Sequence, residues 1–231
     1  MSQPLADTVT ALLGIDHLAI RASDPDELGR FLCDHCGMQR TDSPEGFAVL
    51  AAPGGRTRLF LLQAEETPNP GLLERLVLRV ADLDAAITKL PDGFQVDRTA
   101  PDLAVFKAPE GLALGFTSVL GGGVDYDVDH AVLSVMDPDE TTLALAELGF
   151  VPSGGALHVG DKHLRVETGM RSAGDNELLS HIGVLVESVE ALKGQALRGG
   201  LQFDELTRAP NKLGIYVRGA ERIRVEYAEP G

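Results

Sequence analysis

Two stretches of the chain share a pattern that decides the fold. DHLAIRASDPDE spans residues 16–27, and DHAVLSVMDPDE spans residues 129–140. Both begin with Asp-His and end with Asp-Pro-Asp-Glu, and the two histidines lie 130 − 17 = 113 residues apart. In both, an apolar strand-like run leads to a turn at Asp-Pro and then to a helical stretch that ends at a glycine. The chain therefore contains an internal repeat.

Two fainter copies of the repeat complete the pattern. RLVLRVADLDAAITKL at 75–90 and HIGVLVESVEALKGQAL at 181–197 each give an apolar strand, an acidic turn and a helix. Short strand-like runs follow every helix, at 56–62, 103–116, 156–167 and 213–227. The sequence thus predicts an α+β fold of four units, each with one strand, one helix and three further strands. The glycines of VLGGGVDYD at 119–127 are typical of a linker, which favours pairing the units as 14–120 and 126–229.

Composition narrows the class of partner. The chain has 231 residues, 44% of them hydrophobic, which suffices for one large domain or two small ones. Lys and Arg number 20 against 35 Asp and Glu, so the net charge is −15. This charge works against nucleic acid and anionic membranes as partners, and a small molecule is the expected ligand.

Location and cysteine chemistry follow from the same inspection. No apolar run is long enough to span a membrane, and the start MSQPLADTVTALLG lacks the basic residues of a secretory signal, so we expect a cytoplasmic protein. Cys33 and Cys36 form a C-x-x-C motif, which can indicate a redox pair or half of a zinc site. No second pair accompanies it, and we interpret both cysteines as packing residues near a helix end.

The four units resemble the βαβββ modules of the vicinal oxygen chelate superfamily, which includes glyoxalase I, fosfomycin-resistance proteins and type I extradiol dioxygenases. The resemblance covers nearly the whole chain and is greatest to a short two-domain extradiol dioxygenase. It implies that paired modules form two cup-shaped incomplete barrels, with metal ligands on the first and last strands of the modules. It also implies that 14–120 is an N-terminal domain with a degenerate metal site, and that 126–229 carries the metal and the active site.

A candidate metal site follows from aligning the units. Seven residues before the turn, their first strands carry His17, Arg75, His130 and His181. The final strand carries Glu226. We therefore predict that His130, His181 and Glu226 bind one metal, because two imidazoles and a carboxylate suit non-haem Fe(II), with Mn(II) or another divalent metal as alternatives. A histidine on an apolar strand that does not bind a metal is usually a hydrogen-bonded core residue. We interpret His17 as a residue of this structural kind.

The resemblance also implies catalytic residues. Tyr216 lies 226 − 216 = 10 residues before Glu226 and would hydrogen-bond to a substrate oxygen. Extradiol dioxygenases also carry an acid–base histidine late in the third module, and His163 is the nearest candidate here. A histidine suits this role because imidazole titrates near neutral pH. The implied reaction is extradiol cleavage of a catechol by dioxygen.

Two other functions stay open. A glyoxalase-type isomerase or lyase would use a fourth ligand, for which Glu167 is the candidate, and would act without dioxygen. A metal-free protein of the same fold would only bind a small molecule. Edge strands of such cups often pair between chains, which leaves a homo-oligomer open as well.

Overall fold

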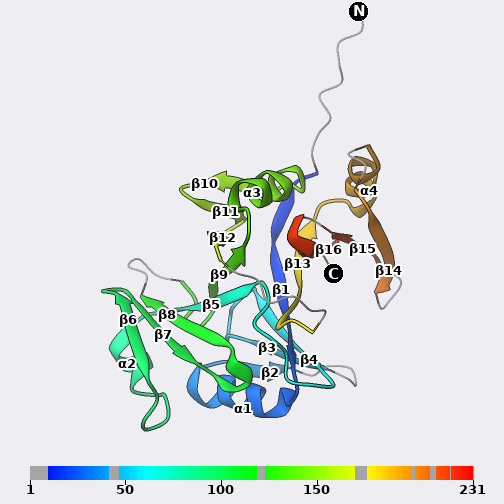
Figure 1. Ribbon diagram of the computed structural model, residues 1–231. Coiled ribbons are helices and arrows are strands. Elements are labelled where there is room, and N and C mark those ends of the chain that lie inside the picture. Colours follow the sequence, from blue (N-terminus) through cyan, green and yellow to red (C-terminus); the bar gives the residue numbers. More distant parts are fainter. Residues whose placement is uncertain are drawn as a thin grey trace, which may run out of the picture.

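The computed structural model describes residues 10–41, 47–118, 123–169, 176–198, 201–208, 212–218 and 220–230. Within them the chain forms four βαβββ units in two mixed sheets (Figure 1). The first unit contains β1 (Leu12–Ala22), α1 (Pro25–His35), β2 (Gln39–Thr41), β3 (Phe47–Ala51) and β4 (Arg58–Gln63). The second contains β5 (Leu73–Val80), α2 (Leu83–Ile87), β6 (Val96–Ala100), β7 (Leu103–Lys107), the 3-10 helix η1 (Pro109–Gly111) and β8 (Ala113–Ser118).

The second half of the chain repeats this order. The third unit contains β9 (Val128–Val135), α3 (Pro138–Glu147), β10 (Val151–Ser153), β11 (Ala156–Val159) and β12 (Lys162–Thr168). The fourth contains β13 (Leu179–Val186), α4 (Val189–Arg198), β14 (Phe203–Arg208), β15 (Lys212–Arg218), the 3-10 helix η2 (Ala220–Arg222) and β16 (Arg224–Ala228). The predicted α+β architecture of four units is confirmed. None of the described helices is long and apolar enough to cross a membrane.

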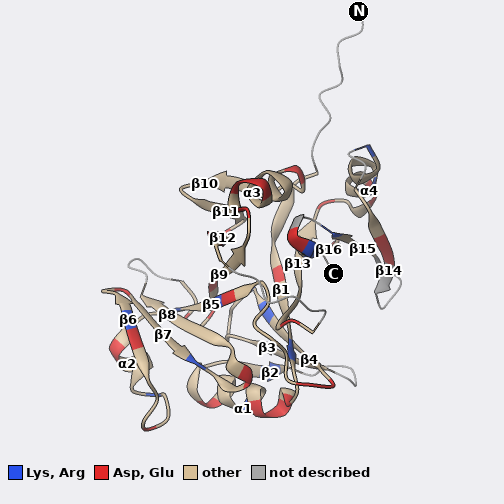
Figure 2. Ribbon diagram, in the orientation of Figure 1, with Lys and Arg blue, Asp and Glu red and all other residues tan. Residues whose placement is uncertain are grey.

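The repeated Asp-Pro-Asp-Glu motif forms the start of a helix. The Asp24 side chain accepts a hydrogen bond from the backbone N–H of Glu27, and Asp137 accepts one from Glu140 in the same way. The proline then occupies the first helical turn, where its missing N–H costs nothing, and the acidic residues interact favourably with the positive end of the helix dipole. The acidic positions of α1 and α3 are the red segments of these helices in Figure 2.

Each unit pairs its first strand in parallel with its last strand, and units join through their first strands. The sheet orders are β14-β15-β16-β13-β1-β4-β3-β2 and β10-β11-β12-β9-β5-β8-β7-β6. β1 and β13 are antiparallel neighbours in the first sheet, as β5 and β9 are in the second. The first cup, formed by β1–β4 and β13–β16, therefore combines the first and fourth units. The second cup, formed by β5–β12, combines the second and third units.

This pairing corrects the sequence prediction, in which 14–120 and 126–229 each closed a cup. All four units share one strand and helix pattern, so the pattern defines the units without specifying which first strands will meet. The first unit is linked to the second, and the third to the fourth, by capping side chains instead. Glu110 on η1 accepts hydrogen bonds from Ser23 Oγ and the backbone N–H of Asp24, before α1. Glu221 on η2 accepts from the backbone N–H groups of Met136 and Asp137, before α3.

The two faces of each sheet differ in composition. On β1, Leu18 and Ile20 are buried with Leu28 and Leu32 of α1 in the hydrophobic core. Side chains alternate along a strand, so the residues between them point to the other face, into the cup. His17, which directly precedes Leu18, points to the same face as Ala19. Within the described residues the two cysteines are free thiols, and burial raises the pKa of Cys36, which agrees with a packing role.

Candidate metal centre

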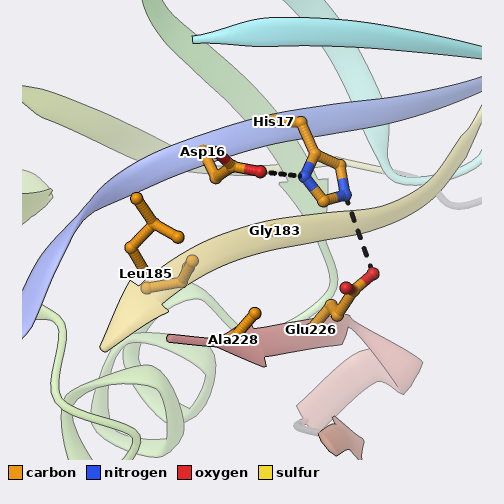
Figure 3. A pocket seen from close by; sticks show the side chains of 7 residues that line it. Asp16, His17, Gly183, Leu185, Glu226 and Ala228 are labelled. Carbon is orange, nitrogen blue, oxygen red and sulfur yellow. Dashed lines mark hydrogen bonds and ion pairs between the residues drawn. The ribbon is translucent and has the colours of Figure 1, made fainter. Parts of the chain in front are cut away.

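Three buried side chains converge in the first cup. They are His17 on β1, His181 on β13 and Glu226 on β16, and their ligand atoms all lie within 4.8 Å of one another. His181 Nε2 is 3.1 Å from His17 Nε2 and 3.1 Å from Glu226 Oε2, and His17 Nε2 is 3.7 Å from the same carboxylate oxygen. Figure 3 shows His17 and Glu226 pointing toward one another across β13. We call these three residues the triad.

Strand register explains the convergence. β16, β13 and β1 are adjacent, and Glu226, Gly183 and His17 are directly opposite one another across them. Gly183 lies between the two ligands. A Cβ built there would lie 2.2 Å from His17 Cε1 and 2.3 Å from Nδ1, far closer than real contacts. The imidazole therefore occupies the volume that a side chain at residue 183 would fill, and this lets it reach Glu226.

The preceding residue orients His17. His17 Nδ1 donates to Asp16 Oδ2 at 2.8 Å, and Arg58 Nη2 donates to Asp16 Oδ1 at 2.6 Å. Burial alone would raise the pKa of Asp16, but the hydrogen bonds from His17 and Arg58 hold it below its ordinary value. A carboxylate on Nδ1 fixes the ring and leaves Nε2 as the ligand atom, an arrangement typical of metal-binding histidines.

The second histidine is suited to the same role. Burial lowers the pKa of His181, although its contact with Glu226 opposes the shift, so the neutral imidazole that a metal requires is favoured. Tyr216 lies opposite Glu226 on β15, and its hydroxyl is 3.5 Å from His181 Nε2. The structure thus brings three of the predicted site residues together: His181, Glu226 and Tyr216.

The fourth position of the first cup carries an aromatic ring. In the fourth unit, Glu226 lies opposite Gly183, two residues after His181. In the first unit, the corresponding residue is Phe60, which lies opposite Ala19, two residues after His17. The ring of Phe60 stacks on His17 with centroids 4.1 Å apart, and Phe47 stacks on Phe60. The site therefore offers two nitrogens and one carboxylate, the donor set that suits non-haem Fe(II).

The second cup holds the remaining predicted residues. His130 and His163 are directly opposite on β9 and β12, and their rings stack with centroids 4.7 Å apart. Asp129 joins them as a further group with ligand atoms within 4.8 Å. Its carboxylate is already bound by Arg79 at 2.8 Å and by His130 Nδ1 at 2.8 Å. Burial, followed by the charge of His130, lowers the pKa of His163 to about 4.

The equivalent ligand positions of the second cup disfavour a cation. Where the first cup has His17 and Glu226, the second has Arg75 and Arg165, by the same strand register. Arg75 Nη2 lies 4.0 Å from Glu167 Oε1, and the Glu167 side chain is 52% exposed. Guanidinium groups at these two positions would repel a metal ion.

Two sequence predictions are therefore wrong. His130 does not share a site with His181 and Glu226, because β9 pairs with β5 rather than with β13. His163 and Glu167 belong to the second cup, because β12 pairs with β9, so neither lies beside the triad. His17, interpreted as structural, takes the place given to His130. The sequence did show that His17 and His181 occupy the same position in their units. It did not show that the first and fourth units pair, so the two histidines could not be assigned to one site.

Comparison with known proteins places this geometry in context. The sequence profile of the Glyoxalase/Bleomycin resistance protein/Dioxygenase superfamily matches residues 14–104. Glyoxalase I from Zea mays superposes with a TM-score of 0.73 at 13% identity, covering 94% of this chain and 92% of that one. A putative dioxygenase from Bacillus subtilis subsp. subtilis str. 168 gives 0.65 at 20% identity, with 96% and 87% covered.

A third solved structure is similar along its whole length. The cppA protein from Streptococcus pneumoniae TIGR4 gives a TM-score of 0.68 at 12% identity, covering 95% of this chain and 100% of that one. A comparison with curated protein sequences gives no match. At these identities the solved structures establish the fold alone.

Proposed function

Because residues 14–104 match the sequence profile of the Glyoxalase/Bleomycin resistance protein/Dioxygenase superfamily, we propose that this chain is a metal-dependent extradiol dioxygenase acting on a catechol-type aromatic diol. The observation that supports this proposal is the triad of His17, His181 and Glu226 beside Phe60, which offers no ligand atom. A site with only these protein ligands leaves coordination positions for both oxygens of a diol and for dioxygen.

The metal would be Fe(II), with Mn(II) as the alternative. When bound, it would lower the pKa of the diol hydroxyls and pass electron density from the ring to dioxygen. The residues of the chain determine where this happens. Asp16 holds the His17 ring in place, and the negative charge of Glu226 offsets part of the charge of the cation. The buried position of all three ligands keeps competing water away.

Tyr216 is the proposed substrate-positioning residue. Its hydroxyl reaches His181 at 3.5 Å, so it lies beside the metal site and can donate a hydrogen bond to a diol oxygen there. Phe47 and Phe60 are half-buried on the opposite side of the triad and offer apolar surface to an aromatic ring. His163 has no part in this scheme because it lies in the second cup.

Oxygen uptake tests the proposal directly. Protein loaded anaerobically with Fe(II) should consume dioxygen and a catechol in equal amounts, giving a product whose mass is that of the catechol plus one dioxygen. Glu226→Ala should abolish uptake, whereas Glu167→Ala, a carboxylate of the second cup, should leave it unchanged. Metal-dependent turnover without oxygen consumption would instead identify an isomerase or lyase. Ligand binding that survives chelation, without turnover, would identify a binding protein.

A further inference from the structure

Arg224 lies on the same face of the first cup's sheet as the triad. Arg224 and Glu226 are two residues apart on β16, so their side chains lie on one face of the sheet. The guanidinium carbon of Arg224 lies 4.6 Å from the centroid of the Tyr216 ring. That ring in turn packs edge-on against His181, with centroids 5.1 Å apart. Arg224 is therefore separated from the metal ligands by a single aromatic side chain.

The guanidinium has no acidic partner among the described residues. Its Nε is buried and donates no hydrogen bond to any acceptor in that part of the chain. Neighbouring arginines differ, because Arg58 pairs with Asp16 and Arg218 pairs with Asp204. A buried donor without an acceptor costs free energy, and a chain with 35 acidic residues offers many carboxylates that could have supplied one.

We propose that Arg224 binds a carboxylate on the substrate, so that the substrate is an aromatic diol bearing an acidic side group. This inference rests on the proposed function for the position of the diol at the triad. A guanidinium presents a planar fork of donors that matches a carboxylate, and stacking on Tyr216 fixes the plane of the fork. The net charge of −15 repels anions, and the positive charge of Arg224 would offset this repulsion locally.

The charge of the side group can be tested with a matched pair of ligands. We would measure anaerobic binding of 3,4-dihydroxybenzoate and 3,4-dihydroxybenzamide to the metal-loaded protein by calorimetry. The wild-type protein should prefer the carboxylate by about tenfold or more, the range of one charge-assisted hydrogen-bond pair. Arg224→Gln should reduce this preference to about twofold or less, while Arg224→Lys should keep part of it because the charge is retained.

Controls separate this inference from the proposed function. Metal content and the circular dichroism spectrum of Arg224→Gln should match those of the wild type, which shows that the variant is folded. Benzoate and benzamide, which lack the diol, form a second pair whose difference depends on Arg224 alone. If neither diol binds but benzoate is still preferred in an Arg224-dependent way, the proposed function fails and the anion site stands. Equal binding of acid and amide by the wild type, or a preference that survives in Arg224→Gln, overturns the inference.

Discussion

Substituting Gly183 by alanine should remove metal binding while leaving the fold intact. The added Cβ would lie 2.2 Å from His17 Cε1, whereas ordinary contacts begin at 3.4 Å, so the ring must move by about 3.4 − 2.2 = 1.2 Å. The ring cannot retreat freely, because Phe60 stacks on it at 4.1 Å and Asp16 holds Nδ1 at 2.8 Å. Metal–ligand distances tolerate only about 0.2 Å, so His17 would cease to be a ligand.

The magnitude follows from losing one ligand of the triad. Disturbing residues that merely orient a ligand costs about 10–100-fold in metal affinity, so loss of the ligand itself should cost at least about 100-fold. Overpacking should also lower the free energy of unfolding by about 1–3 kcal/mol. Co(II) titration followed by visible absorbance measures the affinity, and urea unfolding measures the stability. Gly14→Ala is the matched control on β1, because its Cβ would meet nothing within 4 Å. Wild-type Co(II) affinity in Gly183→Ala would refute the reasoning.

Three further predictions concern other residues of the two cups. Phe60→Glu should place a carboxylate at the fourth position, so divalent-metal affinity should rise in Co(II) titration while oxygen uptake falls. Lower affinity with retained uptake would contradict the equivalence of residues 60 and 226. Tyr216→Phe should keep stoichiometric metal and lower turnover about 10–100-fold, in the range of a lost positioning hydrogen bond; unchanged turnover would remove that role. Because burial lowers the pKa of His163 from 6.5 to about 4, the unfolded chain binds more protons between these values, and stability should fall as pH falls through that window. Solvent screening of this half-exposed ring limits the loss to about 1 kcal/mol, and urea unfolding of His163→Gln should show a flatter pH dependence.

The local part of the fold could be predicted from the sequence because it is encoded locally. Asp24 and Asp137 cap their helices through contacts three residues away, and the alternation of β1 assigns His17 to the face opposite Leu18. These rules act within one unit and apply to every copy of it. His181 and Glu226 were predicted together for the same reason, since they occupy the first and last strands of a single unit.

The pairing of the units is a tertiary property, and the site depends on it. The sequence does contain a signal. Opposite the histidines of β1 and β13 stand Gly183 and Ala19, which are small enough to let an imidazole cross the neighbouring strand. Opposite Arg75 and His130 in the second cup stand two valines. The residue two positions after His17 or His181 is small, whereas the residue two positions after Arg75 or His130 is a valine. This difference in size distinguishes the two cups, but it can be recognised only when the first strands are considered as pairs.

The central claim is that one metal ion binds between β1, β13 and β16, and iron stoichiometry in two histidine variants tests it most directly. His17→Ala and His130→Ala alter the same first-strand position in two units, one from each cup. Both variants should be loaded anaerobically with Fe(II), passed over a desalting column and assayed for iron. We predict that His130→Ala retains about one iron per chain and that His17→Ala retains none. Iron lost from His130→Ala and kept by His17→Ala would contradict the account.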